Sequence, residues 1–358
     1  MIENRRDIEE RYNFIGTLDM YFSGRRIGFL DIETTGLNPK KAHVIMVGLL
    51  TYLYGEDSPA EFVQLAAESI DEEEALLRKT AELLSDVDII VSYNGNAFDL
   101  PFLHQRAEAC NADRGGMQMS IFTCDELKLN IGCAIDLYEI FKLHSGFKAF
   151  LPNMRQKTVE DFLGLWEHRE DKVSGAESVK MYFDYLKARR VGDEDSAHEL
   201  MRLMCLHNSD DVLQLARLPI AFDKFNHHRA FFYSGFHAKP DFAVDKISIG
   251  DEKLIISGRH LKKTMENEFF NDPAAAFSAE FDAYSGLFDF RIPLIRKSDL
   301  LCIDLLRLEK GDNSGAFNEL EKYPACQSGF LVIRKGEVVN YQELNNFVIV
   351  FLGMYGGK

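Results

Sequence analysis

Residues 26–36 read RIGFLDIETTG, an apolar stretch that is interrupted by two acids. Side chains of a strand alternate between its two faces, so Asp31 and Glu33, two residues apart, leave the same face. Partial burial of a carboxylate pair is costly unless a cation or a proton compensates the charge. We therefore expect this pair to bind a cation. Two solvated acids on an exposed strand face are the alternative.

The neighbouring sequence alternates strand-like and helix-like stretches, which indicates an α/β domain. The stretches 43–56 (HVIMVGLLTYLYGE) and 61–67 (EFVQLAA) are β-rich and joined to the first by turn residues, so a meander of three strands is expected. Apolar spacing and helix-start signals predict the later elements. These are a helix over 72–84, a buried strand over 88–94, a helix over 100–110, a strand over 133–141, a short helix over 157–166 and a long helix over 196–218.

Residues 221–358 differ in character from the preceding part of the chain. Strand-like segments dominate there, separated by Gly, Asp and Asn. We interpret the chain as a leader over residues 1–24, an α/β domain over 25–220 and a smaller β-rich domain over 221–358. The expected strands of this last domain lie over 242–249, 253–259, 287–295, 329–334 and 347–352.

The composition describes a globular chain that is acidic. Lys and Arg number 41 against 57 Asp and Glu among 358 residues, a formal charge of -16, which argues against binding nucleic acid through bulk electrostatics. The longest apolar run, 347–352, is far too short to span a bilayer, and the charged first residues do not read as a signal peptide. Six cysteines without a C-x-x-C pair predict neither a zinc cluster nor disulfides. A soluble cytoplasmic protein is expected.

A third acid lies in the segment YNGNAFD, directly after the apolar strand that ends near residue 93. Asp99 stands at the start of the next helix, and loops at the carboxyl ends of strands are where ligands usually bind in α/β sheets. Asn94 adds an amide and Phe98 a face on which a base can stack. The alternative for Asp99 is a favourable interaction with the helix dipole only.

The segment HNSDD, residues 207–211, carries the last candidates. His207 and Asp211 are four apart on a predicted helix and share a face, whereas Asp210 points away. A metal-binding carboxylate beside an imidazole that accepts a proton from water would form a catalytic pair. A solvated helix face is the alternative.

The order Asp31, Glu33, Asp99, His207 and Asp211 resembles the DEDD superfamily of 3′-to-5′ exonucleases. The motifs that carry the resemblance are DIETTGL, YNG-x-x-FD and HN-x-x-D, together with LPNMRQKTVEDFLG at 151–164. This combination is similar to a predicted exonuclease family related to the proofreading domains of B-type DNA polymerases, over roughly residues 25–218. Those proofreading domains usually carry Tyr where His207 stands, so the role of His207 follows the histidine branch of the superfamily.

The resemblance implies a ribonuclease H-like mixed sheet flanked by helices, and a two-metal mechanism. Hard oxygen ligands suit Mg²⁺ or Mn²⁺. Asp31, Glu33, Asp99 and Asp211 would hold two such ions, and His207 would act as the base. The same resemblance implies contacts to the terminal nucleotide or scissile strand from Thr34, Thr35, Leu37, Asn94 and Phe98, and a phosphate contact from Lys157, for which a merely solvated lysine is the alternative.

The expected function is therefore metal-dependent 3′-to-5′ hydrolysis at single-stranded or frayed ends of DNA or RNA. A structure-selective endonuclease on the same acids and a non-catalytic nucleic-acid-binding module are the alternatives. A third alternative is an interaction protein in which the β-rich domain recruits a partner and the nuclease is secondary. The choice between DNA and RNA and the identity of any protein partner stay open. Cations of the β-rich domain are candidates for a local basic groove, with scattered solvated cations as the alternative: Arg259, Lys262 and Lys263, or Arg291, Arg296 and Lys297.

Overall fold

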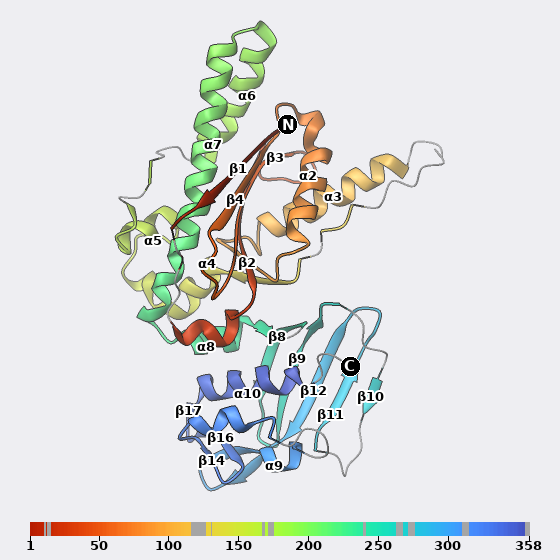
Figure 1. Cartoon of the computed structure of the whole chain (residues 1–358), viewed down its shortest axis with the longest axis vertical. Coiled ribbons are helices and arrows are strands. Elements are labelled where there is room, and N and C mark those ends of the chain that lie inside the picture. Colours follow the sequence, from red (N-terminus) through yellow and green to blue (C-terminus); the bar gives the residue numbers. More distant parts are fainter. Residues whose placement is uncertain are drawn as a thin grey trace. The chain divides into compact units, whose positions relative to one another are not determined.

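A computed structural model shows the chain as two compact units, Met1–Phe225 and Asn226–Lys358 (Figure 1). The structure describes residues 1–10, 12, 16–115, 127–129, 131–166, 169–170, 175–238, 241–262, 268–270, 276–309 and 315–354. Within these residues, no helix has both the length and the apolar character that a bilayer crossing requires.

The first unit is built on a mixed sheet that has six strands among the described residues, in the order β1-β4-β3-β2-β5-β6. The pairs β1/β4, β4/β3 and β3/β2 are antiparallel, whereas β2/β5 and β5/β6 are parallel. The strands are β1 (Ile2–Ile8), β2 (Arg26–Thr34), β3 (Val44–Leu53), β4 (Ala60–Ala66), β5 (Ile89–Ser92) and β6 (Cys133–Asp136). This arrangement confirms the expected mixed sheet and the meander β2–β3–β4.

Helices cover both faces of this sheet (Figure 1). Leu30 and Ile32 of β2 belong to an apolar core that includes Leu76 and Leu77 of α2 and Leu103 of α3. The helices and helical turns of the unit are η1 (Gly16–Leu18), α1 (Asp19–Phe22), η2 (Ile70–Glu72), α2 (Glu73–Leu84), α3 (Asp99–Gly115), α4 (Leu137–Ile140), the π-helical turn η3 (Phe141–Ser145), η4 (Phe147–Ala149), α5 (Gln156–Phe162), α6 (Gly175–Val191), α7 (Glu194–Arg217) and η6 (Leu218–Lys224).

A second core forms on the opposite face of the sheet, where α6 and α7 pack. Ile45 and Met46 of β3 contact a cluster that includes Tyr182 of α6 and Met201 and Met204 of α7. Because strand side chains alternate, β2 buries Leu30 and Ile32 under α2 and α3 and turns Asp31 and Glu33 toward α7. The two acids therefore face α7, where they meet the polar residues His207 and Asn208.

The second unit is β-rich, as expected from the sequence. One sheet has the strand order β10-β11-β12-β9-β8-β7, and the other has the order β13-β14-β16-β15 with β17 paired to β16. The elements are α8 (His227–Ser234), β7 (Phe236–Ala238), β8 (Phe242–Ile249), β9 (Lys253–His260), β10 (Glu268–Phe270), β11 (Ser278–Phe281), β12 (Leu287–Pro293), β13 (Ile295–Lys297), β14 (Leu300–Asp304), α9 (Leu305–Leu308), η8 (Asn318–Lys322), β15 (Cys326–Gln327), β16 (Phe330–Lys335), β17 (Val338–Val339) and α10 (Tyr341–Gly353).

Two expected strands are wrong, each for a physical reason. The apolar run 347–352 lies inside helix α10, because a short apolar run does not distinguish a buried helix from a buried strand. The strand expected over 133–141 ends at Asp136, whose carboxylate accepts hydrogen bonds from the backbone N–H groups of Tyr138 and Glu139. These bonds cap α4 and stop the strand.

Strand β1 and helix α6 are the longest elements of the first unit that the sequence did not predict. Strand β1 lies in the presumed leader and pairs along β4 at the sheet edge; its charged sequence, IENRRDI, hides the strand signal. Helix α6 was missed because its apolar residues do not form a single clear stripe. It is nevertheless anchored by Tyr182 and Tyr185, which are buried against the sheet.

The helical assignment of α10 makes a prediction about stability. Val348 is completely buried and Ile349 is half-buried, whereas a strand would place residue 349 on the same face as Phe347 and Phe351. We expect Val348→Ala to lower the free energy of unfolding by about 1–3 kcal/mol, and Ile349→Ala to cost less. Urea denaturation of the full chain, followed by circular dichroism, measures both. A larger loss for Ile349→Ala would contradict the helix.

Candidate active site

The acids of β2 lie where the strand faces α7. Glu33 is buried and Asp31 is half-buried. Asp31 Oδ2 accepts a hydrogen bond from Asn208 Nδ2 of α7 at 3.0 Å. The side-chain alternation expected from the sequence thus places both carboxylates on the α7 side of the sheet.

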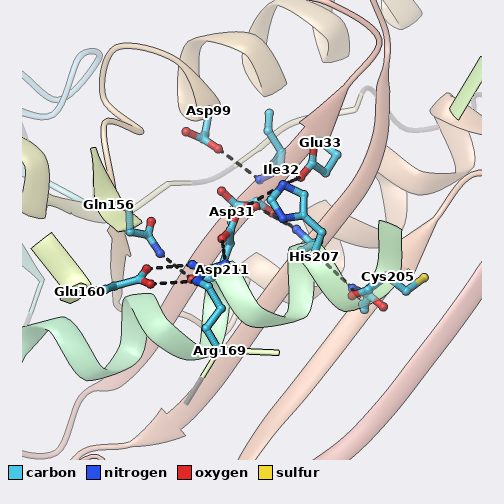
Figure 2. A network of polar contacts seen from close by, with 12 residues as sticks. Asp31, Ile32, Glu33, Asp99, Gln156, Glu160, Arg169, Cys205, His207 and Asp211 are labelled. Carbon is cyan, nitrogen blue, oxygen red and sulfur yellow. Dashed lines mark hydrogen bonds and ion pairs between the residues drawn. The ribbon is translucent and has the colours of Figure 1, made fainter. Parts of the chain in front are cut away.

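Asp99 reaches the same place from the loop after β5. It is the first residue of α3, and its Oδ1 accepts a hydrogen bond from the backbone N–H of Ile32 at 3.2 Å (Figure 2). Because β5 runs parallel to β2, the loop that follows β5 lies at the sheet edge where β2 ends. Asp99 is therefore held against the backbone between Asp31 and Glu33.

The third contribution comes from α7, which was correctly expected to be continuous through the polar segment HNSDD. His207 Nε2 lies 3.4 Å from Glu33 Oε1 and 3.6 Å from Asp211 Oδ2. One ligand atom from each of these three side chains lies within 4.8 Å of the others. The four acids and the histidine, expected from segments far apart in the sequence, are thus brought together (Figure 2).

Gathering these carboxylates has an electrostatic consequence. Burial, reinforced by the charges of Asp211, Asp99 and Glu33, raises the pKa of Asp31 well above its usual range. Burial is also the main cause that raises the pKa of Glu33 to about 7 and that of Asp99 to about 7. Such shifts mean that the charged forms lack compensation. A divalent cation would supply it.

The donor set fits Mg²⁺ or Mn²⁺. The carboxylates of Asp31, Glu33, Asp99 and Asp211 provide hard oxygen atoms, which these ions prefer, and no cysteine is among the described site residues. The residues that could hold the ions are Asp31, Glu33, Asp99 and Asp211. The His207 imidazole lies beside them, with its Nε2 near Glu33 and Asp211.

An arginine that sequence reasoning missed lies next to Asp211. The Arg169 side chain is completely buried; its Nη1 lies 2.6 Å from Asp211 Oδ1, and its Nε and Nη2 donate to both oxygens of Glu160 (Figure 2). Gln156 also holds this part of α7, since its Nε2 donates to the Asp211 carbonyl at 2.8 Å. No local spacing relates residue 169 to residue 211, so no sequence signal could have found the pair.

All the residues expected to contact substrate, except Lys157, lie in two of the segments that carry the acids. Thr34 is buried, with its hydroxyl donating to the Gly36 carbonyl, and the Thr35 hydroxyl accepts from the His43 N–H. Leu37 follows them and is 85% exposed. These hydroxyls hold the turn after β2, together with the Thr35 N–H, which donates to the His43 carbonyl at 2.9 Å.

The other three residues expected to contact substrate, Asn94, Phe98 and Lys157, lie in different surroundings. Asn94 adopts a left-handed backbone conformation (φ 67°), and its N–H donates to Asp136 Oδ1 at 2.8 Å. Phe98 packs against Phe102, with ring centroids 5.4 Å apart, so it belongs partly to the core. Lys157 is half-buried in the first turn of α5, next to Gln156.

The ion pairs of the second unit do not support the basic groove that was considered there. Most of its candidate cations pair with aspartates: Arg259 with Asp245, Lys262 with Asp241, Arg291 with Asp289 and Arg296 with Asp251. Lys263 lies outside the described residues. Cations that are already paired attract a polyanion less, so the alternative of scattered surface cations describes these residues better.

The raised pKa values predict how the metal-free protein responds to pH. Between the usual values, 4.5 for Glu33 and 3.8 for Asp99, and their folded-state values of about 7, the folded chain binds more protons than the unfolded chain. The contribution of these acids to stability is therefore lost as pH rises through this window. In chelator, the midpoint temperature of thermal unfolding should therefore fall as the pH is raised through this window. Mg²⁺ at about 100 times its Kd should add about 2.7 kcal/mol to the free energy of unfolding.

Asp31→Asn provides the comparison, since it removes one of the repelling charges. We expect it to raise the midpoint in chelator near neutral pH and to weaken the effect of Mg²⁺. Asp195→Asn, at an exposed acid in the first turn of α7, is the matched control. An Mg²⁺ response equal in wild type and Asp31→Asn would contradict a cation site at these acids.

Two of three comparisons with known proteins found a match. A structure of the family B DNA polymerase from the hyperthermophilic archaeon Pyrobaculum calidifontis matches with a TM-score of 0.37 and 18% sequence identity, covering 93% of this chain and 46% of that polymerase. This chain thus spans less than half the length of the polymerase. The comparison with curated proteins found no match. A family model of the RNase H superfamily matches residues 28–222, more than half of the 358 residues, and the chain belongs to that superfamily.

Proposed function

We propose that the protein is a metal-dependent 3′-to-5′ exonuclease that hydrolyses phosphodiester bonds at single-stranded or frayed ends of DNA or RNA. Membership of the RNase H superfamily supports a nuclease-type function. The observation that carries the finer proposal is the convergence of Asp31, Glu33, Asp99 and Asp211 on one face, with His207 Nε2 between two of the carboxylates.

Each site residue has a role in this proposal. Asp31, Glu33, Asp99 and Asp211 hold the cations. Bound divalent ions would supply an activated water and offset the charge that develops on the leaving 3′ oxygen. His207 Nε2 faces the carboxylates and accepts the proton of the attacking water; imidazole is suited to this because its ordinary pKa lies near neutrality.

Arg169 restricts the orientation of the Asp211 carboxylate in the proposed site. Its guanidinium lies against Oδ1, whereas Oδ2 faces His207. The Asp211 side chain is thereby kept in one orientation, with Oδ2 directed to the reacting side. Arg169 pairs with Glu160 as well as with Asp211. Its positive charge therefore does not cancel the negative charges of Asp31, Glu33 and Asp99.

Recognition of a chain end follows from the loop after β2. Leu37 projects into solvent only four residues beyond Glu33, which suits an apolar contact with a terminal base. With a net charge of -16, the chain offers little general attraction to duplex DNA, so binding should depend on the bound cations and on local contacts. Thr34, Thr35, Asn94, Phe98 and Lys157 are the remaining residues proposed for these contacts.

The test is digestion of end-labelled DNA and RNA oligonucleotides in Mg²⁺, Mn²⁺ or chelator. Wild type should release nucleotides one at a time from the 3′ end, only with a divalent ion. Asp31→Asn should reduce the rate to background, and His207→Gln should slow it by roughly 10²–10⁴-fold, the usual worth of a general base. Asp184→Asn, at an exposed acid of α6, should match wild type.

Two outcomes would overturn parts of this proposal. Full activity of Asp31→Asn would show that the acids are not the catalytic centre. Cleavage of a circular single strand would replace the exonuclease by the endonuclease alternative, since a circle has no end. Binding of oligonucleotides without hydrolysis under every metal condition would favour a non-catalytic module.

A further inference from the structure

Asn208 is a polar side chain of α7 that the catalytic scheme does not use. It lies between His207 and the acids of HNSDD, and it is fully buried. Its Nδ2 lies 3.0 Å from Asp31 Oδ2 and 3.4 Å from the Asp31 carbonyl, while its Oδ1 lies 2.9 Å from Gln64 Nε2 of β4. The amide thus joins the helix to two strands of the sheet.

The orientation of this amide follows from the bonds around it. The Cys205 carbonyl can only accept, and it lies 2.8 Å from Gln64, so the Gln64 NH₂ group must face it. That NH₂ group also faces Asn208, which must therefore present its oxygen to Gln64. The Asn208 NH₂ group is left to donate to Asp31. A backbone carbonyl therefore determines, through two amides, which atom meets the carboxylate.

The sheet is shaped to admit this side chain. Gly48 of β3 is the register partner of Asp31, directly beneath the amide. A Cβ atom at position 48 would lie 2.5 Å from Asn208 Oδ1 and 2.8 Å from a methyl carbon of Val212. Any larger residue there would displace Asn208 from between the helix and the strands. Glycine at position 48 thus leaves the space that the Asn208 amide occupies.

The Asn208 amide is a neutral hydrogen-bond donor to Asp31, and this neutrality has an advantage for cation binding. A carboxylate that is free to rotate pays conformational entropy when it binds a metal ion, and a hydrogen bond from a fixed neighbour removes that cost in advance. Lys or Arg in place of Asn208 would also fix Asp31, but would cancel the charge that attracts the cation. The amide orients the carboxylate and leaves its charge intact, unlike the arginine on Asp211.

We propose that Asn208 is a positioning residue that holds the Asp31 carboxylate in its cation-binding orientation, and that Gln64 fixes the direction of the Asn208 amide. This inference rests on the proposed function, because it assigns Asp31 to a divalent-ion site. It predicts that the hydrogen bond acts on metal affinity, with little effect on the affinity for the nucleic-acid strand.

The test measures Mn²⁺ binding directly, by the electron paramagnetic resonance signal of the free ion titrated into the full chain. Asn208→Leu keeps the branched shape of the side chain and removes the donor. It should weaken Mn²⁺ binding by roughly 10–100-fold, and raise the Mg²⁺ concentration for half-maximal cleavage similarly, as is typical of residues that orient metal ligands. At saturating Mg²⁺, the KM for the oligonucleotide should stay as in wild type.

Gln64→Met is the second variant, and it keeps the test decisive if Asn208→Leu does not fold. It releases the amide of Asn208 to turn, so it should weaken Mn²⁺ binding in the same direction but less. The matched control is Asn345→Leu, at another fully buried asparagine, whose Nδ2 donates to the His228 carbonyl within the second unit. It should lower stability and leave Mn²⁺ affinity unchanged.

The outcomes separate this inference from the proposed function. A folded Asn208→Leu or Gln64→Met with wild-type Mn²⁺ affinity overturns the role of the amide. An equal loss in Asn345→Leu overturns it too, since general destabilisation would then explain the effect. Wild type that binds Mn²⁺ but hydrolyses no oligonucleotide refutes the nuclease proposal alone, and the Mn²⁺ titrations still decide the role of Asn208.

Discussion

The close packing of α7 across β2 and β3 is the constraint on which the site depends. It brings His207 and Asp211 of the helix to Glu33 of the strand, and it does so because small or apolar residues let the two elements approach. Gly48 is the clearest case, since a side chain there would meet α7. A wider separation would leave two half-sites, each with too few oxygen atoms to hold a small hard cation.

Electrostatic repulsion is the cost of this packing. Like charges held together in a buried place raise one another's pKa values, and the pKa of Asp31 is raised well above its usual range. The protein compensates part of this charge internally, through Arg169 on Asp211, and leaves the rest to be compensated from outside. The imbalance is local, so the residual negative charge is concentrated at these acids.

Most elements of the first unit could be predicted from the sequence, whereas the exceptions have physical causes. The spacing of α7 was readable because burial of one helix face imposes a helical period, and β2 was readable as an apolar run interrupted by two acids. Strand β1 escaped because an edge strand can be highly charged, and α10 was mistaken for a strand because a continuously apolar run has no period to distinguish the two structures. The groups around Asp136 show how a single cap can end a strand that propensity alone would have extended.

The local part of the site could be predicted from the order of residues: strand alternation turns Asp31 and Glu33 to one face, and the spacing of four puts His207 and Asp211 on one face of a helix. The side chains that hold these acids in place could be identified only once the elements were packed together. Arg169 reaches Asp211, and Gln64 reaches Asp31 through Asn208, from segments that no spacing rule connects. The physical reason is that periodicity records which face of an element is buried, whereas the partner across that face depends on how separate elements pack.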